Sequence, residues 1–241
     1  MGGHIFKDPK GHPSTQKITR QQVVPTVQWL EKLTGLNLTD NMLGSTGVSD
    51  ISGDIDLGVD STKVTKEVLI NLLLNKGIDR KNITKTGDCV CLRTPIMGDG
   101  EAHGYVQTDF IFSDDPAWQH FAVTGGAPNS PYKGMHRHIL LSSIAKALNM
   151  KWSPKFGLVD RATSEPISKD PKEIAQKLVD GTPNDIKTVE SIIKKIKSRP
   201  DFERLVADAK ETFKREGLEL PESSPLPGTG AWFRAWQLKD Y

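Results

Sequence analysis

Two aspartates separated by one apolar residue, Asp54 and Asp56, are the first candidates for chemistry in this sequence. Side chains alternate along a β-strand, so both carboxylates would lie on one face, while Ile55 and Leu57 would anchor the opposite face in a core. The sequence has no lysine or arginine between residues 32 and 63 to neutralise these acids. Carboxylate oxygens are ligands that Mg²⁺ prefers. The spacing therefore predicts a strand whose acidic face holds a metal ion.

A glycine followed by a serine, Gly44 and Ser45, comes ten residues before Asp54. Glycine has no side chain to keep a bound group away, so the backbone can approach a phosphate closely. The serine adds a hydroxyl group, and free backbone N–H groups at such a turn can bind an anion. The pair therefore predicts a phosphate-binding turn beside the acidic strand.

A third aspartate, Asp109, lies in a largely apolar run over residues 104–112 that we expect to be a strand. A lone carboxylate on a strand usually faces solvent. It can instead share a face with other carboxylates around a cation, which offsets the cost of removing the charge from water. The residues alone leave both interpretations open.

The elements that must position these residues follow from apolar periodicity and from glycines that stop helices. The segment of residues 1–17 is polar, and we expect a loosely ordered arm. Strands are expected over residues 89–94 and 104–112, and short strands with turns over residues 151–167. Helices are expected over residues 18–36, 63–76, 135–148, 172–179, 186–198 and 201–217.

The composition is that of a globular protein, with 36% hydrophobic and 26% charged residues in a chain of 241. No apolar run approaches the roughly 20 residues needed to span a membrane, and the first residues lack the apolar region of a signal peptide. We therefore expect a cytoplasmic protein that does not bind membranes. Cys89 and Cys91 are two residues apart in a strand-like run, which favours reduced thiols in the core.

Positive charge is concentrated in the second half of the chain. Residues 130–172 contain eight lysines and arginines against three acids, although the net charge of the whole chain is only +2. A basic half beside an acidic half suits a polyanion that is bridged to metal ions, whereas any single lysine is as readily a solvated surface residue. The aromatic segment of residues 231–236 could stack on bases, but such a tail more often docks on its own domain.

Taken in order, these motifs resemble the DNA polymerase beta-like nucleotidyltransferase superfamily. Gly44 and Ser45, then residues 52–56 (Ser-Gly-Asp-Ile-Asp) and 108–110 (Thr-Asp-Phe), are similar to its palm. Residues 122–125 (Ala-Val-Thr-Gly), the following helix, and residues 155–161, 165–167 and 171–174 are similar to the thumb of family X DNA polymerases. The resemblance covers about residues 40 to 185 and is closest to minimal, viral-type members that consist of palm and thumb.

The resemblance implies an α+β fold. A nucleotidyltransferase palm, with a mixed β-sheet flanked by helices, would occupy residues 1–121 together with the N-terminal helix. A small thumb-like α/β subdomain would occupy residues 122–185. A helical C-terminal extension with the aromatic tail would occupy residues 186–241.

The resemblance also implies roles for individual residues. Asp54, Asp56 and Asp109 would be catalytic and would hold two Mg²⁺ ions, with Mn²⁺ as a substitute. The nucleotide-binding residues would be Gly44, Ser45, Ser52, Gly53, Thr124 and Gly125. The residues that contact nucleic acid would be Lys133, Arg137, His138, Lys146 and Lys151.

The expected reaction is transfer of a nucleoside monophosphate from an NTP or dNTP to a 3′ hydroxyl of nucleic acid, with release of pyrophosphate. DNA is favoured over RNA as the partner, and a monomer is expected. One alternative is a nucleotidyltransferase that acts on a tRNA, a protein or a small molecule, since that chemistry needs the three carboxylates but no thumb. The other is an inactive nucleic-acid-binding module, against which the three intact aspartates argue.

Overall fold

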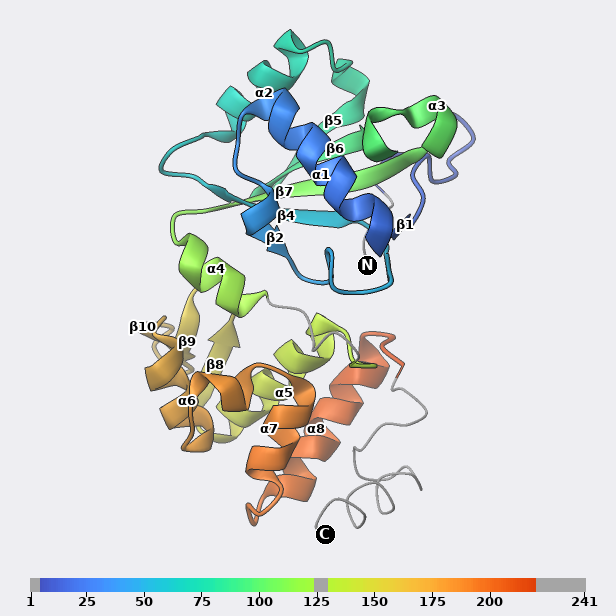
Figure 1. Ribbon diagram of the computed structural model, residues 1–241. Coiled ribbons are helices and arrows are strands. Elements are labelled where there is room, and N and C mark those ends of the chain that lie inside the picture. The colour runs from blue at the N-terminus through green and yellow to red at the C-terminus, as the bar shows by residue number, and fades with distance from the viewer. Residues whose placement is uncertain (1–4, 124–129, 220–241) are drawn as a thin grey trace. The chain divides into compact units, whose positions relative to one another are not determined.

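The chain divides into two compact units, Met1–His120 and Phe121–Tyr241, in the computed structural model shown in Figure 1. The structure describes residues 5–123 and 130–219. Three parts had been expected, with boundaries after residues 121 and 185. The division into units lies within one residue of the first boundary, whereas residues on both sides of the second belong to the same unit.

The first unit contains a mixed five-stranded sheet. Strands β4 (Ile55–Asp60) and β7 (Tyr105–Ser113) are parallel neighbours at its centre, and the other pairs are antiparallel. The strand order is β2-β4-β7-β6-β5, in which β2 is Met42–Leu43, β6 is Cys89–Pro95 and β5 is Ile83–Thr86. The fold of this unit is therefore α+β, with the sheet flanked by helices.

Helices α1 (Arg20–Thr34) and α2 (Lys66–Asn75) cover one face of this sheet, and Figure 1 shows α1 lying across it. The strands alternate as expected, since Ile55, Leu57 and Val59 of β4 join the apolar stripes of both helices in one buried core. Burying one such side chain stabilises the fold by roughly 1.5–3 kcal/mol. Asp56 of the same strand consequently lies on the opposite face.

The helix ends follow local signals in the sequence. Helix α1 ends at Gly35, which adopts the left-handed conformation with φ 71° and donates its N–H to the carbonyl of Glu31. Helix α2 begins after Thr65, whose hydroxyl accepts a hydrogen bond from the N–H of Val68 at 3.2 Å. Both helices are shorter by a few residues than the ranges expected from periodicity, because such caps decide the ends.

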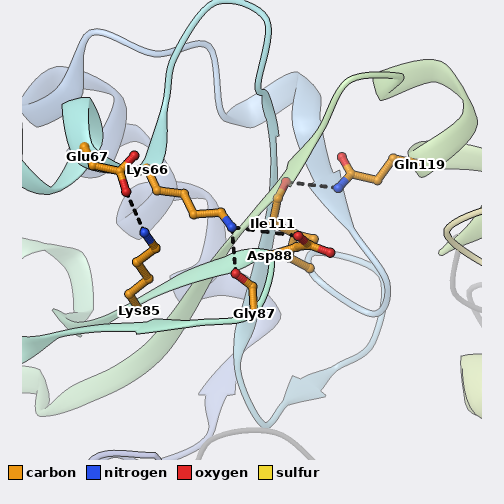
Figure 2. Close-up of polar contacts among 7 residues, drawn as sticks. All are labelled: Lys66, Glu67, Lys85, Gly87, Asp88, Ile111 and Gln119. Atoms are coloured by element: carbon orange, nitrogen blue, oxygen red, sulfur yellow. Dashed lines mark hydrogen bonds and ion pairs between the residues drawn. The ribbon is translucent and has the colours of Figure 1, made fainter.

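Charged side chains tie the start of α2 to the turn between β5 and β6 (Figure 2). Lys66 Nζ donates to the carbonyl of Gly87 at 2.6 Å and lies 3.8 Å from a carboxylate oxygen of Asp88, while Lys85 Nζ lies 2.5 Å from Glu67 Oε1. These contacts help to hold α2 on the sheet. Exposed pairs of this kind contribute little singly, about 0–1 kcal/mol.

The N-terminal segment differs from the loosely ordered arm that its composition predicts. Residues 6–14 form a closed loop, in which Ser14 N–H donates to the carbonyl of Phe6 at 2.9 Å, and the Phe6 side chain is buried. The loop is attached to the sheet by Arg93 Nε, which donates to the Ser14 carbonyl at 3.1 Å. Burial of one aromatic ring and these long-range backbone contacts order a segment that has no periodic pattern of its own.

The first unit also contains several short elements. Strands β1 (Ile18–Thr19) and β3 (Ile51–Ser52) form a separate two-stranded sheet, and α3 spans Gly100–His103. Helix α4 (Pro116–Ala122) follows β7 and crosses the division between the units.

The second unit is built around α5 (Gly134–Ala147), a helix expected from the sequence, against which α8 (Phe202–Arg215) packs. Between them in sequence come an antiparallel sheet and two further helices. These elements are β8 (Met150–Ser153), β9 (Gly157–Asp160), β10 (Pro166–Ser168), α6 (Pro171–Val179) and α7 (Val189–Ile196). No helix within the described ranges is long and apolar enough to cross a membrane. The aromatic tail lies outside those ranges.

Candidate metal centre

The three aspartates singled out from the sequence come together on the sheet face opposite α1 and α2. Asp56 of β4 and Asp109 of β7 are direct partners in the parallel pairing of these strands. Asp54 lies in the bend just before β4, since the strand begins at Ile55. One carboxylate oxygen from each residue lies within 4.8 Å of the others. Asp109 therefore shares its surroundings with two other carboxylates and does not stand alone on a surface.

The electrostatics of this cluster favour a cation. Burial, followed by the negative charges of Asp54 and Asp109, raises the pKa of Asp56 to about 7. Like charges this close disfavour ionisation, whereas a divalent cation would reverse that preference. The ligands are carboxylate oxygens, which suit the hard ions Mg²⁺ and Mn²⁺ better than softer metals. The three side chains thus fit the kind of ion that the sequence predicted.

Gln107 is a neighbour of the cluster that the sequence analysis missed. Its side-chain Nε2 donates to both oxygens of Asp109, at 2.9 and 3.1 Å, and its Oε1 accepts the backbone N–H of Ile5 at 3.0 Å. The side chain is 2% exposed. The available signal was the period of two along β7, which puts residues 107 and 109 on the same face.

The turn expected to bind phosphate lies directly beside the cluster. Gly44 and Gly47 have φ values of 61° and 72°, which favour glycine, so the chain can turn sharply between β2 and β3. The hydroxyl of Thr46 accepts the backbone N–H of Asp56 at 2.8 Å. This bond fixes the turn that contains Ser45 against the strand that carries Asp56.

Other residues of this loop have structural roles. Ser52 is 2% exposed, and its hydroxyl donates to the Ser45 carbonyl at 3.3 Å. The Ser52 hydroxyl thus closes the loop in this structure, and its expected contact with a nucleotide stays a prediction. Arg20, at the start of α1, pairs with Asp50 at 3.0 Å and also donates to the Val48 carbonyl. Gly44, Ser45 and Gly53 are half-buried and remain beside the cluster.

The two cysteines lie on β6, on the same face as Asp109. Cys91 is the strand partner of Asp109, and both thiols are free. Burial, followed by a hydrogen bond to Asp109, raises the pKa of the Cys91 thiol. Burial, followed by the charge of Asp109, raises the pKa of Cys89 to about 11. The cysteines are thus protonated and line the acidic face as neutral groups.

Arg137 lies in the interior of the second unit and is 1% exposed. Its Nε donates to the carbonyl of Ile186 at 2.8 Å, and its Nη1 donates to those of Ala122 and Phe121 at 3.0 and 3.3 Å. Burial lowers the pKa of the guanidinium to about 10. The expected contact of Arg137 with nucleic acid is therefore corrected, because this side chain joins segments of its own unit.

His138 is also held inside the second unit. Its Nδ1 accepts a hydrogen bond from Trp152 Nε1 at 3.0 Å, and the two rings stack. Burial, followed by the charge of Arg137, lowers the pKa of His138 to about 4. A neutral imidazole lacks the charge that attracts phosphate, and the expected contact of His138 with nucleic acid stays a prediction.

The three lysines expected to bind nucleic acid lie nearer the surface. Lys133 is exposed at the start of α5. Lys146 Nζ lies 2.5 Å from Asp208 Oδ1, and Lys151 Nζ donates to Ser164 Oγ at 3.1 Å. The Lys146 ammonium is thus paired with a carboxylate, and Lys151 has a hydroxyl as its hydrogen-bond partner. Thr124 and Gly125, the remaining expected nucleotide contacts, lie outside the described residues.

A scan against models of protein families finds no match to this chain, and no match emerges from a search of curated proteins.

Proposed function

We propose that this protein is a metal-dependent nucleotidyltransferase that adds nucleoside monophosphates from an NTP or dNTP to a nucleic-acid 3′ hydroxyl. One observation carries the proposal: three carboxylates from adjacent parts of one sheet face meet within 4.8 Å, next to a glycine-containing turn. The mixed sheet with helices on one face is compatible with the palm of the DNA polymerase beta-like superfamily, which the motifs resemble.

In this proposal the chain supplies positions and charge. Asp54 and Asp56 would hold two Mg²⁺ ions, and Asp109 would join them at the ion beside the acceptor hydroxyl. When bound, the ions supply charge that favours ionisation of the acceptor hydroxyl and neutralises the phosphate oxygens. Gly44 and Ser45 would hold the distal phosphates through backbone N–H groups and the serine hydroxyl.

The reaction itself is an in-line displacement. The acceptor hydroxyl gives its proton to solvent water and its oxygen forms a bond to the α-phosphorus, while the bond from that phosphorus to the oxygen of the leaving pyrophosphate breaks and its electron pair stays on the pyrophosphate. Most of the acceleration would come from orientation of the two reactants and from electrostatic stabilisation of the charge that develops. The chain's contribution is a rigid arrangement of carboxylates, which strand pairing between β4 and β7 supports.

A second candidate is transfer of a nucleotide to a tRNA, a protein or a small molecule. The contacts of Arg137 and His138 favour the protein or small-molecule acceptor within this alternative, because two of the five side chains expected to contact nucleic acid are engaged inside their own unit. The carboxylates and the glycine-containing turn would serve either acceptor equally. The choice between the candidates therefore depends on the acceptor, not on the metal centre.

The deciding experiment incubates the purified protein with Mg²⁺ and each labelled NTP and dNTP. Separate reactions contain single-stranded DNA, primed DNA, tRNA or no added acceptor, and the Asp109→Asn variant serves as the matched control. Label on the 3′ end of either DNA, with equimolar pyrophosphate and none from the control, supports the leading proposal. Label on tRNA alone, or on the protein itself in the reaction without added acceptor, supports the second candidate. The absence of transfer and of pyrophosphate in every reaction contradicts the leading proposal and excludes tRNA and the protein itself as acceptors.

A further inference from the structure

The contacts of Gln107 define the orientation of its side-chain amide without ambiguity. A backbone N–H can only donate, so the group that faces Ile5 must be the acceptor Oε1. With Oε1 facing Ile5, the group that faces the carboxylate of Asp109 is the donor Nε2. One amide thus connects the N-terminal segment to a carboxylate of the candidate metal centre.

This contact opposes two tendencies of Asp109. The terminal torsion of an aspartate is soft, so the carboxylate plane is poorly fixed by the backbone alone. Repulsion from the two other carboxylates, within 4.8 Å, would also turn it away before a cation binds. An NH₂ group shared between both oxygens resists such rotation and still leaves lone pairs on each oxygen for a cation.

Gln107 is itself held in place. Its side chain is 2% exposed, and its partner Ile5 directly precedes the closed loop of residues 6–14. That loop is attached to β6 through the hydrogen bond from Arg93 to Ser14, and residue 16 continues the attachment, because Gln16 N–H donates to the Tyr105 carbonyl at 2.8 Å. The N-terminal segment therefore holds the Gln107 amide through the N–H of Ile5, on the side away from Asp109.

We infer that Gln107 is a positioning residue that presets the Asp109 carboxylate for cation binding, and that the backbone N–H of Ile5 presets Gln107. The inference rests on the metal centre of the proposed function, whatever the acceptor. Partners that orient metal ligands typically change metal affinity by about 10- to 100-fold when removed. A residue of this kind should act on the metal before it acts on any nucleotide.

The experiment measures Mn²⁺ affinity of the full-length chain by electron paramagnetic resonance and calorimetry, without nucleotide. Gln107→Met keeps the length of the side chain but removes its donor. The matched control is Gln119→Met, because Gln119 is also buried and its Nε2 donates at 3.0 Å to the carbonyl of Ile111 on the same strand (Figure 2). We expect Mn²⁺ affinity to fall by about 10- to 100-fold in Gln107→Met and to stay unchanged in Gln119→Met.

A second pair of variants tests the role of the N-terminal segment. Ile5→Pro deletes the N–H that bonds to Gln107, whereas Ile5→Ala keeps it and removes only side-chain contacts. We expect a loss of Mn²⁺ affinity of a few-fold in Ile5→Pro and none in Ile5→Ala. Equal affinities in the two variants would overturn the part of the inference that concerns Ile5.

The variant Asp109→Asn separates the possible failures. If it loses Mn²⁺ binding while Gln107→Met keeps the wild-type affinity, the positioning role is overturned and the metal centre stands. If Asp109→Asn also keeps wild-type affinity, the metal centre and the positioning role both fail. If Gln107→Met loses affinity but the wild-type protein transfers no nucleotide to any acceptor, the positioning role stands and the proposed activity fails.

Discussion

Two regions of this protein remove charge from water, and they compensate for it in different ways. The acidic face of the first unit gathers Asp54, Asp56 and Asp109, whose mutual repulsion helps to raise the pKa of Asp56 to about 7. The interior of the second unit holds the single cation Arg137, which donates to three backbone carbonyls. The first arrangement places like charges together. In the second, the oxygens of backbone carbonyls face one positive charge.

The difference separates a site for a ligand from a structural contact. Carboxylates that repel one another lower stability unless a cation binds. The Arg137 guanidinium has part of its compensation within the fold, because Nε and Nη1 donate to carbonyls, whereas Nη2 is buried without a hydrogen-bond partner among the described residues. Burial of charge alone is therefore weak evidence of function, and the sign of the neighbouring charges is the informative part.

The largest expected effect is on activity at the acidic face. Asp109→Asn should lower the rate of nucleotidyl transfer by at least about 10³-fold, by analogy with removal of a main transition-state stabiliser. The fold should survive, since the change is nearly isosteric and removes a repulsive charge. The matched control is Asp60→Asn, on the same strand as Asp56, where the carboxylate accepts hydrogen bonds from Thr62. Near-normal turnover of Asp109→Asn would show that the acidic face is not the site of nucleotidyl transfer.

The next largest effect is on stability at the buried cation. Arg137→Ala removes the donor to the buried carbonyls of Ile186 and Ala122, and each buried group left unsatisfied costs about 1–3 kcal/mol. We expect the free energy of unfolding to fall by at least about 2 kcal/mol, measured by urea denaturation. Arg204→Ala is the control, because Arg204 is 72% exposed and pairs with Asp201 at 3.6 Å. If the free energy of unfolding falls by the same small amount in both variants, the structural role assigned to Arg137 is wrong.

A third test uses pH to probe the interior of the second unit. The pKa of His138 falls to about 4 in the folded protein, below its unfolded value of 6.5. The neutral form is therefore favoured by folding, and the stability it contributes is complete above pH 6.5 and is lost as the pH falls through about 4. His138→Gln cannot take up this proton, so it should remove about 2 kcal/mol of the acid-dependent destabilisation. The free energy of unfolding is measured by denaturation at several pH values between 7 and 4. If it falls by the same amount in the wild-type protein and in His138→Gln, the assignment is contradicted.

The smallest expected effect concerns the lysines at the surface of the second unit. If Lys133 and Lys151 contact phosphates, each alanine variant should reduce the slope of log affinity against log salt by roughly 0.9 on duplex DNA. Lys81→Ala in the first unit is the control, since Lys81 is 76% exposed. Fluorescence anisotropy with labelled DNA at several salt concentrations measures the slope. Identical slopes in all four proteins would favour an acceptor other than nucleic acid.

Much of the local structure could be predicted from the sequence because its signals are local. Gly35 stops α1, and the alternation of β4 separates Ile55, Leu57 and Val59 from Asp56. The same logic does not reach the N-terminal segment, whose order depends on burial of Phe6 and on contacts with β6 and β7. Those contacts join residues far apart in the chain, and they cannot be predicted from any periodicity within residues 5–16.

The sequence by itself determined which groups this protein can offer: two aspartates with strand spacing, a third in another strand-like run, and a Gly-Ser turn. Only the tertiary structure decided which of the candidate groups meet. Parallel pairing of β4 with β7 brings Asp109 to Asp56, and the fold of the second unit withdraws Arg137 and His138 from solvent. The physical reason is that residue type and spacing fix the chemistry and the face of an element. Burial, by contrast, is set by what packs on that face, and the same arginine can bind a phosphate at a surface or carbonyl groups in a core.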